Sequence, residues 1–241
     1  MTMSRLTHHI SHQFDKELED IRSKVLAMGG LVEEHIHKVL ECFARGDFDE
    51  AEYVAVNDFK VNALELEIDD DCTAILLRRQ PAATDLRLVL SVSKTITDLE
   101  RIGDEAEKIA RLVLNLRGSG GISSYYLGML SMGHHVRRMV RAALDAFARM
   151  DSESAFRIAQ EDREIDAETD AIMRYLITYM MEDPRSISRV LDAVLSVRAF
   201  ERIGDHARNI CENVIYLVEG KDVRHVALEQ VQQELRRDSQ E

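Results

Sequence analysis

The five residues Glu-Arg-Ile-Gly-Asp occur twice in this chain of 241 residues, at Glu100–Asp104 and again at Glu201–Asp205. Each copy places one carboxylate at position i and another at i+4, and these positions are neighbours on one face of a helix. Two like charges so placed repel each other by roughly 0.2–0.5 kcal/mol on an open helix. A motif that is locally unfavourable and is nevertheless present twice indicates a compensating partner, for which a bound cation is the obvious candidate.

In both halves the motif carboxylates extend an apolar stripe of the same predicted helix. These lines of side chains, at 3–4 spacing, are Val89, Ser93, Ile96, Glu100 and Asp104 in the first half, and Val190, Val194, Val197, Glu201 and Asp205 in the second. The acids are therefore expected at the edge of a packed seam rather than on the far, solvated face. A carboxylate at such an edge is costly to desolvate and needs a cation or hydrogen-bond donors.

The preceding helix of each half carries a matching pair of oxygen-bearing side chains. Asp162 and Asp166 are again i and i+4, and their first-half counterparts are Asp58 and Asn62. If neighbouring antiparallel helices present these pairs to the motif, each half offers about four oxygen ligands, a set suited to Mg²⁺, Mn²⁺ or Fe ions. A nearby imidazole would also admit Zn²⁺, and His206, next to Asp205, is the candidate imidazole.

A plainer interpretation stays open, in which the acids belong to solvated helix faces. Glu201 can pair with Arg198 and Asp104 with Lys108, and such pairs stabilise an exposed helix by a few tenths of a kcal/mol, about 0.2–0.5. Elsewhere, Glu34 and His37 form one Glu-x-x-His, of which helical di-iron proteins use two, so a lone surface histidine is favoured there. The chain has no P-loop, dinucleotide fingerprint, nucleophile elbow or HExxH motif, and nothing in it indicates a catalytic nucleophile.

Composition predicts an all-α protein, because the chain has two prolines, no tryptophan and many good helix formers. A net charge of −13 argues against a nucleic-acid backbone as the main partner. The cysteines Cys42, Cys72 and Cys211 form no CxxC motif, which predicts reduced core thiols in a cytoplasmic protein. No stretch approaches the ~20 apolar residues of a membrane span, so any membrane association is expected to be indirect.

Helix stop and start signals divide the chain into six long predicted helices. The predicted C-terminal caps are Gly46 and Gly220, and the predicted N-terminal caps are Asp47, Thr84 and Asp151. Two further helices are expected to stop at Gln80-Pro81 and at Asp183-Pro184. The expected helices span residues 7–45, 47–79, 84–117, 122–150, 152–182 and 186–219. Short connections predict antiparallel neighbours, hence two three-helix bundles, at 1–117 and 122–220, with a polar tail at 221–241. The glycine-rich segment 118–121 is the expected boundary. Gly29-Gly30 predicts either a kink or a close helix crossing in the first helix.

The halves also align outside the motif, which identifies a tandem duplication. The matching segments are Phe43-Ala44-Arg45 with Phe147-Ala148-Arg149, Asp58 with Asp162, Pro81 with Pro184, and Leu90-Ser91-Val92 with Leu195-Ser196-Val197. The spacing between matches changes only at loops or helix ends, as a duplicated fold requires.

Over nearly its whole length the chain resembles the PhoU family. The resemblance is carried by Arg79-Gln80-Pro81, Asp85-Leu86-Arg87 and Glu100–Asp104 in the first half, and by Tyr179–Asp183 and Glu201–Asp205 in the second. It implies two tandem three-helix bundles and a cytoplasmic accessory protein of phosphate-specific transport. It also implies metal clusters on the acidic motifs, here Asp162, Asp166, Glu201 and Asp205, and Asp58, Asn62, Glu100 and Asp104. Asn62 replaces an acid, which predicts a weaker or differently loaded first site.

The resemblance further implies a negative regulator of the phosphate-starvation response and of phosphate uptake. Its expected partners are the ATPase subunit of the phosphate ABC transporter, a sensor histidine kinase and a second copy of the chain. Two alternatives stay open: a carboxylate-bridged metalloenzyme in a helical bundle, and a structural scaffold with solvated acidic stripes.

Overall fold

The computed structural model describes residues 12–46, 48–115, 117, 126–224 and 226. Every regular element in this part of the chain is helical, which confirms the predicted all-α class. The elements are α1 (His12–Arg45), α2 (Phe48–Asn57), α3 (Phe59–Arg79), α4 (Ala83–Leu114), α5 (Tyr126–Arg149), α6 (Ser152–Glu182), η1 (Pro184–Ser186) and α7 (Ile187–Glu219).

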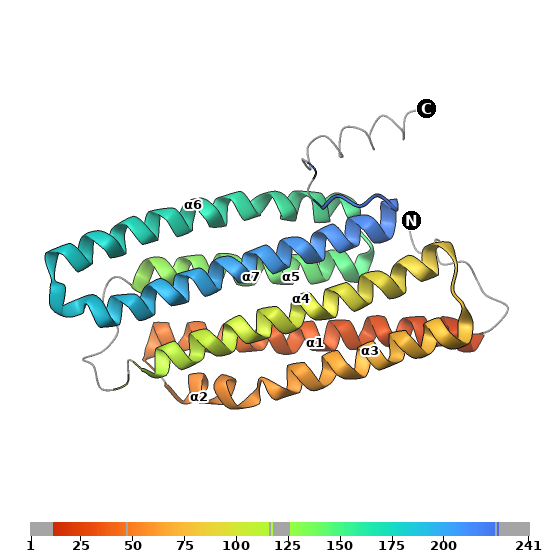
Figure 1. Cartoon of the computed structure of the whole chain (residues 1–241), viewed down its shortest axis with the longest axis horizontal. Helices are drawn as coiled ribbons and strands as arrows, with labels where there is room; N and C mark the ends of the chain where they lie inside the picture. The colour runs from red at the N-terminus through yellow and green to blue at the C-terminus, as the bar shows by residue number, and fades with distance from the viewer. Residues whose placement is uncertain (1–11, 47, 116, 118–125, 225, 227–241) are drawn as a thin grey trace.

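Two three-helix bundles lie side by side with their long axes roughly parallel (Figure 1). Helices α1, α2–α3 and α4 form the first bundle, and α5, α6 and α7 form the second. The bundles meet chiefly where α4 packs along α7, and α1 also packs on α5. The motif-bearing helices α4 and α7 are therefore both central, and each has its own bundle's acidic partner helix on its outer side (Figure 1). The predicted domain limits remain a prediction, because residues 118–125 and most of the tail lie outside the described residues.

Most of the predicted helix ends are confirmed, with a local reason for each. Gly46 and Gly220 have φ of 69° and 71°, the left-handed conformation that glycine adopts without steric cost. Asp151 caps α6 by accepting a hydrogen bond from the Ser154 amide at 3.0 Å. The prediction of Thr84 as a cap is wrong, because α4 begins at Ala83 and Thr84 accepts instead from Arg87 Nη2 at 3.2 Å. Asp47 lies outside the described residues.

The predicted continuous helix over 47–79 is wrong in one respect, since the chain turns at Asp58 between α2 and α3. The amide of Val61 donates to the Asp58 carbonyl at 2.8 Å, a tightened i+3 bond, while Asn57 Nδ2 donates to the Tyr53 carbonyl at 2.8 Å. Asn and Asp compete in this way for backbone groups and so interrupt helices. The turn leaves the Asp58 side chain buried beside α4, which matters for the site below.

The two glycines in α1 have different environments, and the close-crossing interpretation applies to Gly29. A Cβ on Gly29 would lie 2.6 Å from both Cδ atoms of Leu144 on α5, whereas a Cβ on Gly30 would meet nothing within 4 Å. We expect Gly29→Ala to destabilise the protein by about 1–2 kcal/mol through overpacking. Gly30→Ala, its matched control, should stabilise by about 0.5–1 kcal/mol through helix propensity. Urea unfolding of both variants checks this, and equal stabilisation by both would contradict the crossing.

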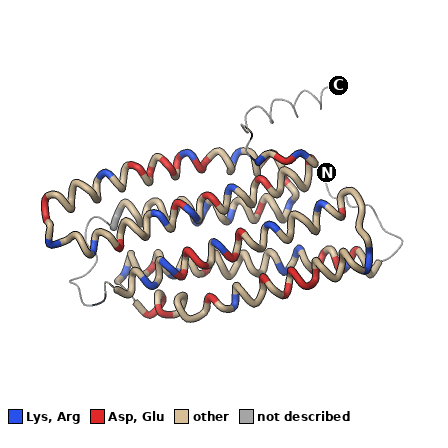
Figure 2. Tube along the Cα trace, viewed as in Figure 1, with Lys and Arg blue, Asp and Glu red and all other residues tan. Residues whose placement is uncertain are grey.

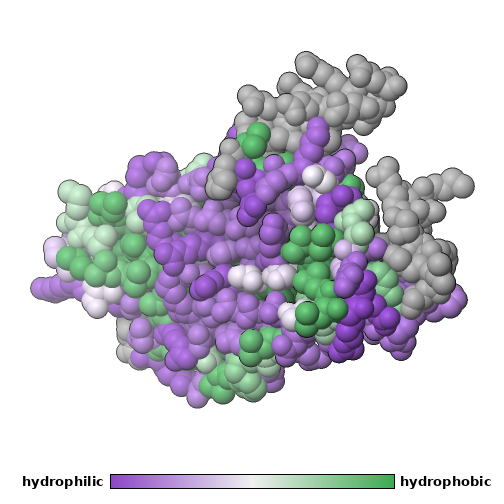
Figure 3. Space-filling view, turned by 45° about the vertical axis from the view of Figure 1, so that its right-hand side comes forward, coloured by the Kyte–Doolittle hydropathy of each residue, from purple (hydrophilic) through white to green (hydrophobic). Residues whose placement is uncertain are grey.

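Acidic and basic residues are interspersed along most of the long helices (Figure 2). Exposed apolar side chains gather in patches between hydrophilic areas (Figure 3), and several belong to the end where α6 leads into α7, among them Ile177, Met181 and Leu191.

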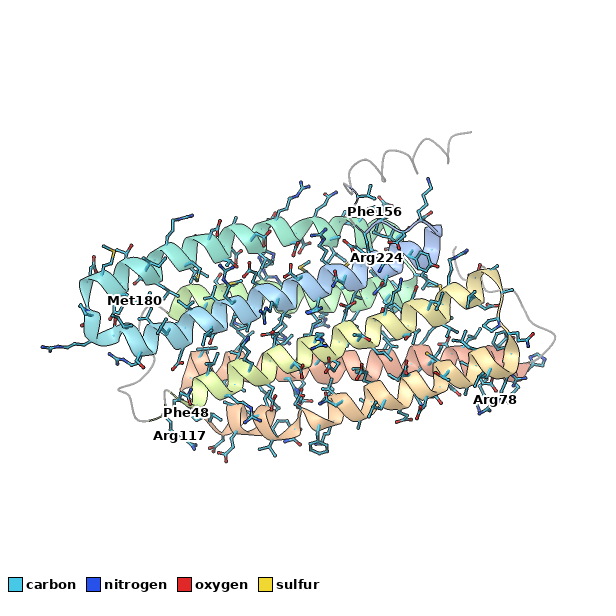
Figure 4. All side chains as sticks on the ribbon, in the orientation of Figure 1. Phe48, Arg78, Arg117, Phe156, Met180 and Arg224 are labelled. Carbon is cyan, nitrogen blue, oxygen red and sulfur yellow. The ribbon has the colours of Figure 1, made fainter. Side chains whose placement is uncertain are left out.

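Arg117 lies over the Phe48 ring at 5.7 Å, which joins the end of the first bundle to the start of α2 (Figure 4). The side chains of Cys42, Cys72 and Cys211 are all buried, as predicted. No helix in the described residues is long and apolar enough to span a bilayer.

Candidate metal sites

In the second bundle the structure brings the predicted carboxylates of α6 and α7 into one electrostatic cluster, which we call the second cluster: Asp162, Asp166, Glu201 and Asp205. Burial and the neighbouring Asp162 and Glu201 raise the pKa of Asp166 above its ordinary value. Burial, followed by the same two neighbours, likewise raises the pKa of Asp205. Like charges therefore face each other across the α6–α7 seam, as the repeated motif predicts.

Two arginines already contact this second cluster. Arg208 Nη1 lies 3.1 Å from Asp162 Oδ2, and its Nε lies 3.1 Å from Glu212 Oε1. Arg198 Nη1 donates to both oxygens of Glu201, at 2.9 and 2.7 Å. The contact between Arg198 and Glu201 is the i,i+3 pair that the solvated-face interpretation predicts. Much of the cluster's negative charge is thus balanced by side chains of α7 itself.

In the first bundle the corresponding group, the first cluster, consists of Asp58, Asn62, Glu100 and Asp104. Asp58 is 5% exposed, and its Oδ1 has no hydrogen-bond partner among the described residues. The Asn62 Oδ1 is also buried without one. Burial raises the pKa of Asp58 to about 6, with Glu107, Asp104 and Glu100 adding repulsion. Orphaned buried oxygens of this kind are costly unless a donor or cation serves them.

Glu100 and Asp104 lie at the more exposed rim of the first cluster, with side chains 20% and 42% exposed. Burial is the main cause that raises the pKa of each. Their cationic neighbour on α4 is Arg101, whose Nε is 3.5 Å from Glu100 Oε2 and whose Nη1 is 3.8 Å from Asp104 Oδ2. Arg101 is itself 59% exposed, so this pairing is weak. The predicted pairing of Asp104 with Lys108 is replaced by one between Lys108 and Glu105 at 3.0 Å.

The glycine inside each motif lets two helices approach closely at the acids. A Cβ on Gly103 would lie 3.0 Å from Asp58 Oδ1 and 3.2 Å from Val61 Cγ1. A Cβ on Gly204 would lie 3.3 Å from Ile165 Cγ2. Both distances are tighter than ordinary packing, so a larger residue would separate the helices. The glycine of Glu-Arg-Ile-Gly-Asp therefore has a packing role that brings the two carboxylate pairs together.

His206, the imidazole predicted for the second cluster, instead crosses to the other bundle. Its Nδ1 lies 3.0 Å from Asp98 Oδ1 on α4. Asn209 and Asn213 of α7 also donate to Asp98, at 3.1 and 3.2 Å, and Arg202 pairs with Glu105 of α4 at 2.9 Å. The prediction that His206 joins the metal ligands is not supported by this placement, because the ring is held at the α4–α7 interface.

Sequence reasoning missed His35, which lies at the first cluster. It is fully buried on α1, neither ring nitrogen has a hydrogen-bond partner among the described residues, and Nδ1 is 4.0 Å from Asp58 Oδ1. Burial lowers the pKa of this histidine. A signal was present, because His35 occupies the apolar stripe between Val32 and Val39. By contrast His37, of the Glu-x-x-His pattern, is only partly buried, with Nδ1 3.4 Å from Arg137 Nη1.

The residues at both clusters fit a cation by donor type, since carboxylate and amide oxygens are the ligands that hard ions prefer. Within the described ranges, no three His, Cys, Asp or Glu side chains converge on one metal-sized position. Binding of one ion by three of these side chains would therefore require them to rearrange. The orphaned oxygens of Asp58 and Asn62, and the close approach at Gly103, are the observations that favour a ligand.

The fold and sites define a duplicated helical-bundle protein whose two motif-bearing helices carry acidic clusters. A family model described as the PhoU domain matches residues 25–113 and 129–214, one match in each bundle. This chain belongs to the PhoU family. It is 51% identical over 230 residues to the phosphate-specific transport system accessory protein PhoU homolog of Pseudomonas aeruginosa, covering 95% of each chain. It is 46% identical over 226 residues to the PhoU accessory protein of Escherichia coli K12, covering 94% of this chain and 93% of that protein.

Solved structures agree with this membership. The crystal structure of PhoU from Pseudomonas aeruginosa superposes with a TM-score of 0.84 at 51% identity, covering 87% of this chain and all of that one, 100%. The phosphate transport system regulatory protein PhoU from Streptococcus pneumoniae gives 0.80 at 32% identity, covering 88% and 99%.

Proposed function

We propose that this protein is a non-enzymatic regulator of phosphate transport that acts in the cytoplasm as an adaptor. In this role it restrains phosphate uptake and the phosphate-starvation response by connecting the ATPase subunit of a phosphate ABC transporter with a sensor histidine kinase. The observation that carries the proposal is the near full-length similarity to proteins named as phosphate-specific transport accessory proteins, which extends over both acidic motifs. A second copy of the chain is a further expected partner.

The acidic clusters are the proposed regulatory sites. Asp58, Asn62, Glu100 and Asp104 would hold one set of metal ions, and Asp162, Asp166, Glu201 and Asp205 the other. Burial, followed by repulsion from neighbouring carboxylates, raises the pKa of Asp58 and Asp205, and a bound divalent or trivalent ion (Fe, Zn, Mn or Mg) would offset that repulsion. The chain's own part is to hold two helices at each site in one arrangement. Occupancy would then stiffen each bundle and favour one docking state over another.

Genetics tests the regulatory proposal directly. We expect deletion of the gene to turn on phosphate-starvation genes in phosphate-rich medium, and the wild-type gene supplied in trans to silence them again. Starvation genes that stay silent in the deletion strain would contradict the adaptor role. Reporter expression at high and low phosphate is the measurement.

Metal content is the direct test of the sites. In protein purified without a metal-affinity tag, elemental analysis should find metal in the wild type and clearly less in Glu201→Ala/Asp205→Ala. The matched first-half variant is Glu100→Ala/Asp104→Ala. Because these four side chains are partly exposed and self-repelling, both variants should fold, and circular dichroism checks this. No metal in any protein after adding Fe, Mn, Mg or Zn salts would leave the acids as a docking surface for a basic partner.

A further inference from the structure

Helix α3 has apolar side chains on two opposite faces, and only one of these faces is packed. Val61, Ile68 and Ile75 are buried, and among the described elements α3 packs only against α1, α2 and α4. The helix lies along the lower edge of the molecule in Figure 1, where no other described helix covers its far side. The far side of a surface helix is ordinarily polar, so apolar residues on it need a separate explanation.

The far side of α3 carries a row of residues spaced alternately four and three positions apart. We call it the outer row, and all of its members are exposed: Phe59, Ala63, Leu66, Asp70, Thr73 and Leu77. Phe59, Leu66 and Leu77 are 62%, 67% and 76% exposed, which is high for large apolar side chains. This alternating spacing is the pattern with which one helix packs along another in a coiled coil. The outer row therefore offers a seam for a further helix.

The duplicated helix α6 does not repeat this row. The step along the chain that leads from Asp58 to Asp162 leads from the outer row to these positions of α6: Arg163, Ala167, Asp170, Arg174, Ile177 and Met181. Charged residues occupy the positions of Phe59 and Leu66, and an arginine occupies that of Asp70. The apolar row is thus a feature of α3 alone and does not follow from the duplicated fold.

Charge identifies the kind of helix that fits the outer row. Between Lys60 and Arg78 the chain contains five acids and no base. Asp70 lies in the middle of the outer row, and its side chain has no hydrogen-bond or ion-pair partner within the described residues. Glu67, beside the row, is 55% exposed although it contacts Lys24. A docked helix would cover Asp70, and a lysine or arginine facing it would supply the missing partner.

A second copy of α3 fits this surface poorly. Two α3 helices packed antiparallel about residue 68 would place Glu67 of one copy against Asp69 of the other. Two packed in parallel would place Asp70 against Asp70. Like charges that face each other across an interface oppose association. The same acids oppose contact with an anionic membrane surface.

We propose that the outer row of α3 is the docking surface for a basic amphipathic helix of a partner protein, with a lysine or arginine of that helix opposite Asp70. The inference rests on the adaptor part of the proposed function and deepens it, because it gives one partner a place on the first bundle and a chemistry. The apolar side chains supply the strength of the contact, and the charge in the middle of the row sets its register.

The direct test uses two designed helical peptides with leucines at the alternating spacing, flanked by lysines in one and by glutamates in the other. With full-length protein, fluorescence anisotropy should show that the lysine peptide binds at least about tenfold more tightly than the glutamate peptide. Leu66→Ser should weaken binding of the lysine peptide about tenfold, because one leucine leaves the contact. Ile177→Ser, the matched control on α6, should leave it unchanged. Failure of the wild type to bind the lysine peptide would overturn the inference.

Charge reversal tests the register. Asp70→Lys should weaken binding of the lysine peptide and strengthen binding of the glutamate peptide, whereas affinities that stay unchanged for both would overturn the role of Asp70. All substituted side chains are exposed, so the variants should fold, and circular dichroism checks this.

Expression of phosphate-starvation genes separates this inference from the proposed function. Phe59→Ser/Leu66→Ser should turn these genes on in phosphate-rich medium, as deletion of the whole gene does, and Ile177→Ser/Met181→Ser should not. Silent genes in the Phe59→Ser/Leu66→Ser strain, with active genes in the deletion strain, would overturn the docking surface and leave the adaptor in place. Silent genes in both strains would overturn the proposed function as well.

Two other occupants of the outer row are outcomes of the same experiments, and either would overturn the inference. A dimer in analytical ultracentrifugation that Leu66→Ser dissociates would assign the row to a second copy. Binding of the lysine peptide only after removal of residues 227–241 would assign the row to the chain's own tail.

Discussion

In metal-free protein at pH 8, Asp58→Asn should raise the free energy of unfolding by about 1–3 kcal/mol, the scale set by a pKa shift of about two units. The folded protein holds the proton of Asp58 more tightly than the unfolded chain does, because burial raises its pKa from 3.8 to about 6. The charged carboxylate therefore costs stability, and this cost is fully present above pH 6. The cost decreases as the pH falls below about 6, and it is gone below 3.8, the pKa of this carboxyl in the unfolded chain. Asparagine removes the charge and keeps the shape.

The same change at the duplicated position should have the opposite sign. Asp162→Asn removes the partner of Arg208 and should destabilise by about 1–2 kcal/mol, a figure kept small because Arg208 is 39% exposed and retains Glu212. Urea unfolding at pH 8, 6 and 4 in the presence of chelator measures both. This account of the two clusters would be contradicted if both substitutions changed the free energy of unfolding in the same direction at pH 8. It would also be contradicted if the stability gained by Asp58→Asn were as large at pH 4 as at pH 8.

Asp98→Ala should be among the most damaging single substitutions, with an expected loss of about 3 kcal/mol, because it leaves three donors at the α4–α7 interface unpaired. Asp98 accepts hydrogen bonds from His206, Asn209 and Asn213, so one carboxylate of α4 holds three side chains of α7. Asn213 is 5% exposed and is therefore poorly placed to turn to water.

Glu105→Ala is the matched control for Asp98→Ala, since Glu105 joins the same two helices through Arg202. Arg202 is 59% exposed, so this change should cost less than about 1 kcal/mol. Equilibrium unfolding gives the energies, and hydrogen exchange along α4 and α7 locates the loss. Equal costs for the two variants would mean that the Asp98 network does not join the bundles.

Helix periodicity, stop signals and the internal repeat together predicted the fold class, most of the helix ends and the pairing of the acidic helices. These are local or repeated features, which a single sequence records directly. The break at Asp58 was missed because Asn57 and Asp58 interrupt a helix only weakly by sequence, and the tightened turn is decided by packing against α4.

The partners of individual charges were less predictable than the fold. His206 was assigned to the acids on its own helix, whereas the structure places it against Asp98, 108 residues away along the chain. His35 was missed because nothing near it in sequence indicates Asp58 as a neighbour. Which residues oppose one another across two packed helices depends on rotation and axial offset, and a repeat within one chain does not supply these quantities.

The burial of the three thiols bears on how the molecule meets oxidants and alkylating reagents. Cys42 lies on α1, Cys72 on α3 and Cys211 on α7, and burial raises the pKa of Cys72 to about 12. A thiol reacts as the thiolate and must be reached by the reagent, so modification at each position has to wait for the helices around it to part. The rate at Cys72 thus follows transient opening of the first bundle and the rate at Cys211 that of the second. Without any added label, the chain contains a separate chemical reporter of breathing motion in each of its duplicated halves.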